Sequence, residues 1–163
     1  MKYHEAMATA EKDKWDKAIK DKHDRMEKFQ VFEAVPRSEV PNDAKILTST
    51  WVMKKKAYGT FRARLMAHGY KQIDGEHYDK DTTAAPVVNE AMIRIVFILM
   101  IMAGWYAELL DVHGAFLHGE FEKGMKLYME VPDGFKSFYP IDCLLLLLQT
   151  IYGLKQAALA FWV

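Results

Sequence analysis

One aspartate, Asp111, stands where this sequence could bind a metal ion. It follows the apolar run 106–110 and precedes a glycine-bearing turn that leads to the aromatic Phe116. The run predicts a strand that enters a sheet core, with Asp111 at its solvent end. A carboxylate there suits Mg²⁺, which binds through one or two carboxylates together with substrate phosphates. An aspartate after a strand is also a common turn residue that hydrogen-bonds its own backbone. Asp111 alone therefore leaves both interpretations open.

A second group of side chains is cationic and lies earlier in the chain. Arg62 and Arg64 are two residues apart, so on a strand they project from one face. With Lys54, Lys55 and Lys56 they form a compact positive patch on a chain whose 22 basic and 22 acidic residues balance. Arginine forks match phosphate oxygens, which suits a triphosphate or a nucleic-acid backbone. Edge lysines also prevent strands from pairing edge to edge, and charge alone does not choose between the two.

A β-hairpin is needed to hold these cations, and the pattern predicts one from about Thr48 to Ala67. Residues 46–56 are rich in β-formers, 58–60 can turn the chain, and 61–67 return as a second strand. Further strands are predicted at 31–35, at 126–131 and in the leucine-rich segment 143–149.

Two long helices are expected around these strands. Residues 5–29 carry many charges and neither glycine nor proline, which favours one N-terminal helix. The second helix begins after Asn89, a good N-cap, and runs to about Gly104. It is apolar almost all round, so we expect it to be largely buried. A last helical stretch is expected after Tyr152.

The composition indicates one folded domain and excludes several kinds of site. Hydrophobic residues make up 51% of the 163 and charged residues 27%, as in ordinary globular proteins. A single cysteine, Cys143, excludes an intrachain disulfide and a four-cysteine zinc site. No apolar run reaches the ~20 residues of a membrane span, and the N-terminus has no apolar leader. We therefore expect an intracellular protein, in a cytoplasmic particle or the nucleus, that is neither secreted nor bound to a membrane.

Other chemistries have less support. His113 and His118, with Asp111 and Glu120, could be drawn as a transition-metal site. Four such residues within ten positions are more often the polar residues of a turn than the ligands of a metal ion. The sequence has no Walker loop, no Gly-x-Ser-x-Gly and no paired-glycine dinucleotide motif.

Six segments stand in a distinctive order and spacing. They are Trp51–Lys56, Arg62–Gln72, Ala85–Val88, Leu109–Glu120, Tyr128–Phe135 and Ile151–Gln156. Together they resemble the reverse transcriptase domain of Ty1/copia-type LTR retrotransposons, over nearly the whole chain. The resemblance implies an α+β fold, a partial right-hand polymerase with an antiparallel sheet. Its parts would be an N-terminal helix (1–30), fingers-like strands and the hairpin (31–88), and the start of the palm (89–163).

The resemblance also implies a chemistry: addition of deoxynucleotides to a primer on an RNA or DNA template. Such a site uses two Mg²⁺ ions about 3.5–4 Å apart. Asp111 would be the first catalytic carboxylate, and the carbonyl of Val112 a second metal ligand. Phe116 would lie against the sugar and exclude a 2′-hydroxyl.

The nucleotide side of this site would be basic. The phosphates would be bound by Arg62 and Arg64, with the lysines 54–56 as part of the patch. Gln156 would lie near the nucleotide and the template.

The chain also departs from the family pattern. The family supplies its other catalytic carboxylates from a Tyr-Val-Asp-Asp hairpin after the last helix, and no adjacent Asp pair occurs here. After Gln156 the family usually reads Ser-Pro-Arg, whereas residues 157–159 are Ala-Ala-Leu. The hairpin is shortened between Lys56 and Arg62. We therefore expect a truncated copy without polymerase activity by itself.

Three functions remain open from the sequence. The first is a fragment of an RNA-directed DNA polymerase. The second is a non-catalytic nucleic-acid-binding or assembly module, and the third is a decayed relic without function. The expected partners of the first are a primer–template and dNTP. A truncated palm would leave the apolar segment 89–104 uncovered, which predicts self-association or pairing with the missing C-terminal palm and thumb.

Overall fold

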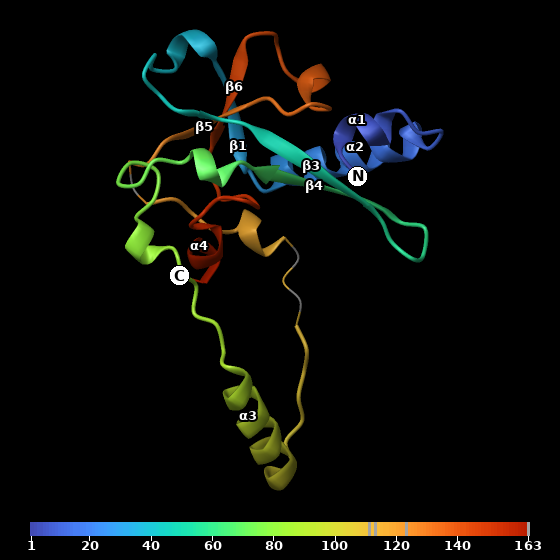
Figure 1. Ribbon diagram of the computed structural model, residues 1–163, viewed down its shortest axis with the longest axis vertical. Helices are drawn as coiled ribbons and strands as arrows, with labels where there is room; N and C mark the ends of the chain where they lie inside the picture. Colours follow the sequence, from blue (N-terminus) through green and yellow to red (C-terminus); the bar gives the residue numbers. More distant parts are fainter. Residues whose placement is uncertain (111, 113, 123, 163) are drawn as a thin grey trace.

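The computed structural model describes residues 1–110, 112, 114–122 and 124–162 (Figure 1). Asp111, His113, Lys123 and Val163 lie outside the described residues. The helices are α1 (Tyr3–Met7), α2 (Lys12–Lys28), α3 (Glu90–Ala103) and α4 (Ala157–Trp162). The strands are β1 (Phe32–Pro36), β2 (Ile46–Leu47), β3 (Ser49–Lys55), β4 (Phe61–Ala67), β5 (Leu127–Glu130) and β6 (Cys143–Leu147).

The strands form a four-stranded sheet and a separate hairpin. The order in the sheet is β1-β6-β5-β2, and β3 pairs with β4 in the hairpin. β6 is antiparallel to both of its neighbours, whereas β2 runs parallel to β5. The predicted hairpin and the three further strands are confirmed, and so is a mixed α and β architecture with a mainly antiparallel sheet. The parallel edge pair was not predicted from the sequence.

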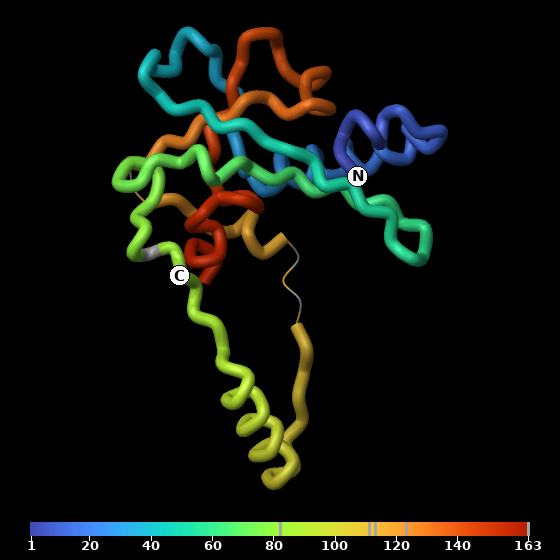
Figure 2. Tube along the Cα trace, viewed as in Figure 1, coloured from blue at the N-terminus to red at the C-terminus, as the bar shows by residue number. Residues whose placement is uncertain are grey.

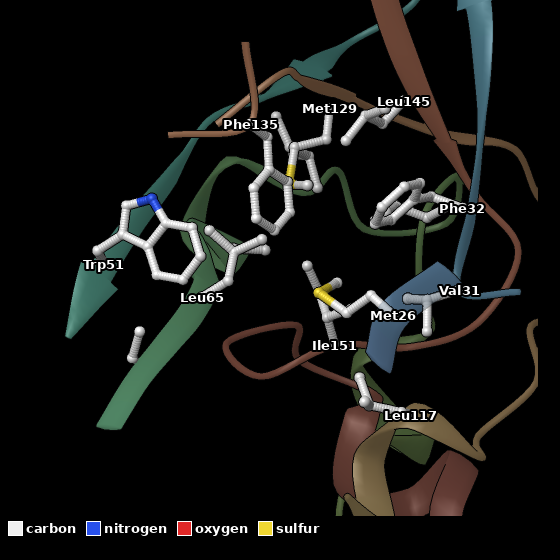
Figure 3. Close-up of a cluster of buried hydrophobic side chains, with 14 of the residues drawn as sticks. Met26, Val31, Phe32, Trp51, Leu65, Leu117, Met129, Phe135, Leu145 and Ile151 are labelled. Atoms are coloured by element: carbon white, nitrogen blue, oxygen red, sulfur yellow. The ribbon is translucent and has the colours of Figure 1, made fainter. Parts of the chain in front are cut away.

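The hydrophobic core joins the hairpin to the sheet (Figure 3). Trp51 and Leu65 point from the hairpin toward Phe135, in the connection between β5 and β6, and all three are almost completely buried. The indole Nε1 of Trp51 donates a hydrogen bond to the carbonyl of Asp133 at 2.6 Å. Burying a large side chain contributes about 1.5–3 kcal/mol. These contacts therefore fix the hairpin against the sheet and set the direction of its other face.

The N-terminal helix expected over 5–29 is interrupted. Residues 8–11 separate α1 from α2, and the hydroxyl of Thr9 donates to the Ala6 carbonyl at 2.7 Å. A threonine that bonds to the backbone in this way competes with helix continuation, so the prediction of one helix was wrong. Within α2 the buried residues are Trp15, Ile19, His23 and Met26, one stripe at helical spacing that packs on the core.

α3 has the predicted ends but not the predicted environment. The Asn89 side chain accepts a hydrogen bond from the Ala91 amide at 2.8 Å, and Gly104 ends the helix at a φ of +66°. The helix has no buried residue and stands away from the rest of the chain (Figures 1 and 2). The expectation of a largely buried helix was therefore wrong, whereas an uncovered apolar surface is what the structure shows. None of the described helices is both long and apolar enough to span a membrane.

The prediction of a strand over 106–110 was also wrong. The segment after α3 forms no strand, and Leu109 is 99% exposed. A strand requires a neighbouring strand to satisfy its backbone groups, and none of the described strands pairs with this segment. The apolar run therefore does not lead into a sheet core.

A close backbone approach connects the end of β4 to the segment that precedes α4. The amide of Ala67 donates to the carbonyl of Tyr152 at 2.7 Å. Gly69 and Gly153 come so close that a Cβ on Gly69 would collide with the Gly153 carbonyl, and one on Gly153 with the Ala67 carbonyl. Gly153 also has a φ of +93°, which L side chains rarely adopt. Two segments far apart in the sequence are held together by this contact.

We predict that Gly153→Ala lowers the free energy of unfolding by about 3 kcal/mol or more, because it combines a strained φ with a backbone collision. Gly59→Ala is the matched control. Gly59 has a φ of +78° with nothing within 4 Å of an added Cβ, so strain alone should cost about 1 kcal/mol. Urea denaturation of both variants measures the difference. Equal losses would contradict the close approach.

Candidate phosphate-binding groove

A groove of about 490 Å³ runs between α2 and the hairpin, and we call it the cationic groove. Its cations are Lys22, Arg25, Lys56, Arg62 and Arg64, and Asp21 is its carboxylate. The remaining lining residues are Ala18, Thr60, Phe61, Ala63, Val112, Gly114 and Tyr152. Elements from the beginning, middle and end of the chain therefore contribute to one cationic surface.

Strand periodicity positions the two arginines. Along β4, Arg62 and Arg64 are exposed while Ala63 and Leu65 are buried, as a period of two requires. Arg62 lies opposite Lys54 in the hairpin register. The prediction that both arginines share one face is confirmed, and the buried neighbours hold that face toward the solvent.

The three lysines of the predicted patch have different positions. Lys56 lines the cationic groove. Lys54 is exposed on β3, opposite Arg62. Lys55 pairs with Glu11 at 2.8 Å, and its ammonium lies 5.1 Å from the centre of the Phe61 ring. The hydrogen bond from Lys55 lowers the pKa of the Glu11 carboxyl. Lys55 therefore connects the hairpin to the N-terminal segment.

The predicted catalytic residue, Asp111, lies outside the described residues, but its neighbours are placed. Val112 and Gly114 line the cationic groove together with the arginines of β4. Phe116 packs edge-on against Tyr152, with ring centres 4.8 Å apart, and its carbonyl accepts a hydrogen bond from the Thr150 hydroxyl at 2.7 Å. The segment around the predicted metal ligands thus borders the same groove as the predicted phosphate ligands.

Tyr152 is a groove residue that sequence reasoning missed. The Lys22 ammonium and the Arg64 guanidinium each lie 5.9 Å from the centre of its ring. Cations at this distance are attracted by the ring electrons, by about 0.5–1 kcal/mol at exposed sites. Tyr152 therefore connects a cation of α2, a cation of β4 and the aromatic Phe116. Its position in the Tyr-Gly-Leu-Lys-Gln segment was the available signal.

Within the described part of the chain, positive charge exceeds negative charge in the groove. Among the described residues, none of the five forms an ion pair with a carboxylate. Burial, together with the nearby charges of Arg25 and Arg62, lowers the pKa of the Lys22 ammonium to about 8. The surroundings of Lys22 therefore disfavour its charged form. An anion bound in the groove would stabilise that form.

Gln156 is held away from the cationic groove. Its amide oxygen accepts a hydrogen bond from Gln72 at 2.9 Å, and its amide nitrogen donates to the carbonyl of His77, also at 2.9 Å. The backbone amide of Lys155 donates to Gln72 at 2.9 Å. Gln156 lines a different pocket, beside Tyr78. In this structure it joins two loops, and the predicted nucleotide contact has no geometric support.

A pair of Mg²⁺ ions would need several hard oxygen ligands at one place. Among its described residues the cationic groove offers one carboxylate, Asp21, and the backbone of Val112. These residues fit the phosphate-binding half of such a site and do not by themselves fit the metal pair.

Histidines and carboxylates also occur together at two other places in the sequence, one of which includes Asp111 and His113, outside the described residues. In the set considered from the sequence, His118 packs edge-on against the Phe29 ring at 4.9 Å. The described residues also bring together His23, Asp24 and Glu27 on α2. The ring of His23 is stacked on Phe138, and its Nε2 shares a 2.7 Å hydrogen bond with the Tyr139 hydroxyl. These contacts involve the ring face and Nε2 of His23, whereas its Nδ1 is buried without a hydrogen-bond partner among the described residues.

Comparison with known proteins identifies relatives over most of the chain. A family profile described as reverse transcriptase (RNA-dependent DNA polymerase) matches residues 30–163. The retrovirus-related Pol polyprotein from transposon TNT 1-94 of Nicotiana tabacum is 33% identical over 158 residues, which is 94% of this chain and 11% of that polyprotein. The corresponding polyprotein from transposon RE2 of Arabidopsis thaliana is 31% identical over 163 residues, 97% of this chain and 11% of its own length.

A third relative, the polyprotein from transposon RE1 of Arabidopsis thaliana, is 34% identical over 128 residues, 76% of this chain and 8% of its own length. No solved structure matches the chain. The chain thus spans about a tenth of the polyproteins that it matches. On this evidence the chain belongs to the reverse transcriptase family of retrotransposon Pol polyproteins.

Proposed function

We propose that this chain is the phosphate-binding part of an RNA-directed DNA polymerase. It would comprise the fingers (31–88) and the start of the palm (89–163) of a right-hand polymerase, behind the N-terminal helices (1–30). The observation that carries the proposal is the cationic groove, in which Arg62 and Arg64 share a surface with Val112. Since β1 pairs with β6, strands of the fingers and palm parts share one sheet. These parts would therefore differ in function without folding separately.

The groove would bind the phosphates of an incoming dNTP and of the primer–template. Arg62 and Arg64 present guanidinium groups, whose paired N–H donors match two phosphate oxygens at once. Lys56 adds a third cation from the hairpin. The rings of Tyr152 and Phe116 lie edge to face beside these cations, where they would limit the space for the sugar.

In this proposal Asp111 and the carbonyl of Val112 bind one Mg²⁺ of a pair, as the family relationship suggests. Two bound ions would neutralise phosphate charge and activate the primer hydroxyl. The sequence has no adjacent pair of aspartates to complete the set. We therefore propose that this chain binds its ligands but does not extend a primer by itself.

A second candidate is a nucleic-acid-binding or assembly module without catalysis. It is favoured by the charge of the groove, whose described lining residues include five cations and one carboxylate. The exposed apolar residues of α3, such as Ile101 at 76% exposure, support self-association or pairing with a C-terminal palm and thumb.

The first test is the salt dependence of primer–template binding by the 163-residue chain. Each phosphate contact contributes roughly one unit to the slope of log K against log [salt]. We predict that Arg62→Gln with Arg64→Gln lowers this slope by about two units. Lys45→Gln, which removes an exposed cation outside the groove, should leave it unchanged. Absence of binding by the unaltered chain, or equal slopes for all three proteins, would contradict the proposal.

The second test asks whether Asp111 has a catalytic role. The chain is mixed with a polypeptide carrying the downstream Tyr-Val-Asp-Asp hairpin of a relative, and primer extension is measured with dNTP and Mg²⁺. We predict extension only in the mixture, reduced at least about 100-fold by Asp111→Asn, because a metal ligand is lost. Asp43→Asn controls for loss of an exposed carboxylate elsewhere. Extension that survives Asp111→Asn would show that the catalytic assignment is wrong.

A further inference from the structure

α2 lies outside the part of the chain that the family profile matches, which begins at residue 30. Yet α2 supplies Lys22 and Arg25 to the cationic groove. The two are three residues apart, so they lie on the same side of the helix, one turn from each other. Two of the five described cations of the groove therefore come from a segment that the family profile does not match.

The orientation of α2 is fixed by its buried stripe. Trp15 is 2% exposed and packs edge-on against Phe61 of β4, with ring centres 4.5 Å apart. Ile19 and Met26 continue the contact with the core along the helix. Rotating the helix to move Lys22 into water would expose these side chains. The core therefore holds the two cations beside β4, although they would separate from Arg62 if free to do so.

Solubility alone does not explain these two cations. Lys20, on the same helix, is exposed to solvent and does not line the groove. Lys22 is half-buried, has no carboxylate partner among the described residues, and lies in the field of Arg25 and Arg62. Like charges held close together in a partly desolvated place repel one another, and a bound anion would offset that repulsion.

We propose that α2 is a second wall of the phosphate-binding groove, in which Lys22 and Arg25 bind phosphate oxyanions together with Arg62 and Arg64. The inference rests on the phosphate binding proposed above for the hairpin and adds a helix to it. Tyr152 contacts both walls, because the charged groups of Lys22 and Arg64 each lie 5.9 Å from the centre of its ring. The oxyanions would come from the triphosphate of a nucleotide or from a nucleic-acid backbone.

Binding by the full chain tests this, with inorganic tripolyphosphate and a primer–template duplex as the two probes. The variants are Lys22→Gln and Arg25→Gln, Lys22→Arg as the charge-conserving variant, and Lys20→Gln as the matched control on α2. We expect Lys22→Gln and Arg25→Gln each to weaken binding about three-fold or more and to lower the duplex salt slope by about one unit. Lys22→Arg should keep most of the affinity, and Lys20→Gln should bind like the unaltered chain.

The probes separate the two sources of phosphate. A loss confined to tripolyphosphate indicates a nucleotide, a loss confined to the duplex indicates the nucleic-acid backbone, and either supports the inference. If Arg64→Gln weakens binding while Lys22→Gln and Arg25→Gln behave like Lys20→Gln, the inference about α2 is wrong and the proposed function stands. If the unaltered chain binds neither probe, both are wrong. Urea denaturation checks folding, and Arg25→Gln alters an exposed side chain, so it remains decisive if Lys22→Gln is unstable.

Discussion

The half-buried ammonium of Lys22, held beside Arg25 and Arg62, is the constraint on which the proposed phosphate-binding groove depends. Lys22 and Arg25 from α2 face Arg62 and Arg64 from β4 across one groove. The stripe of α2 and the buried face of the hairpin hold these cations in place, so the apolar packing offsets the electrostatic cost. A partly desolvated cation of this kind suits a bound anion, in keeping with the phosphate binding proposed above.

The sequence predicted the hairpin well because its evidence is local. A period of two fixes which face Arg62 and Arg64 share, whatever packs behind them. The ends of α3 were equally predictable, since Asn89 and Gly104 act on the backbone beside them. Lys22 and Arg25 could not be selected in this way, because α2 carries many lysines and only its contact with β4 distinguishes one face. Gln156 was chosen from a motif in which Tyr152 is the residue that reaches the groove.

The errors over 89–110 have one physical origin. The hydrophobicity of a segment indicates that other residues should bury it, but it does not indicate which residues do so. α3 is helical through its own caps and backbone, yet none of its residues is buried. The run 106–110 was expected to form a strand, but no described strand pairs with it, so it is extended and exposed. The hydrophobic pattern thus predicts local conformation correctly for the helix and tertiary position incorrectly for both.

The family relationship and the charges of the groove lead separately to the same proposal, a ligand that carries phosphates. The matched family acts on polyanionic substrates, and the chain's overall charge is balanced, so local clustering must supply any attraction. The contact between Gly69 and Gly153 brings Tyr152 to the cations of β4. Two segments of the resemblance thus have a structural reason for their glycines, independent of catalysis.

The most direct test of the central claim is NMR titration of the Lys22 side-chain nitrogen in the free chain and with bound tripolyphosphate. A partly buried ammonium beside Arg25 and Arg62 should titrate near a pKa of about 8 in the free chain, and at a higher pKa once the anion is bound. A free-chain pKa at the ordinary value of 10.5, or one that the anion leaves unchanged, would contradict the account.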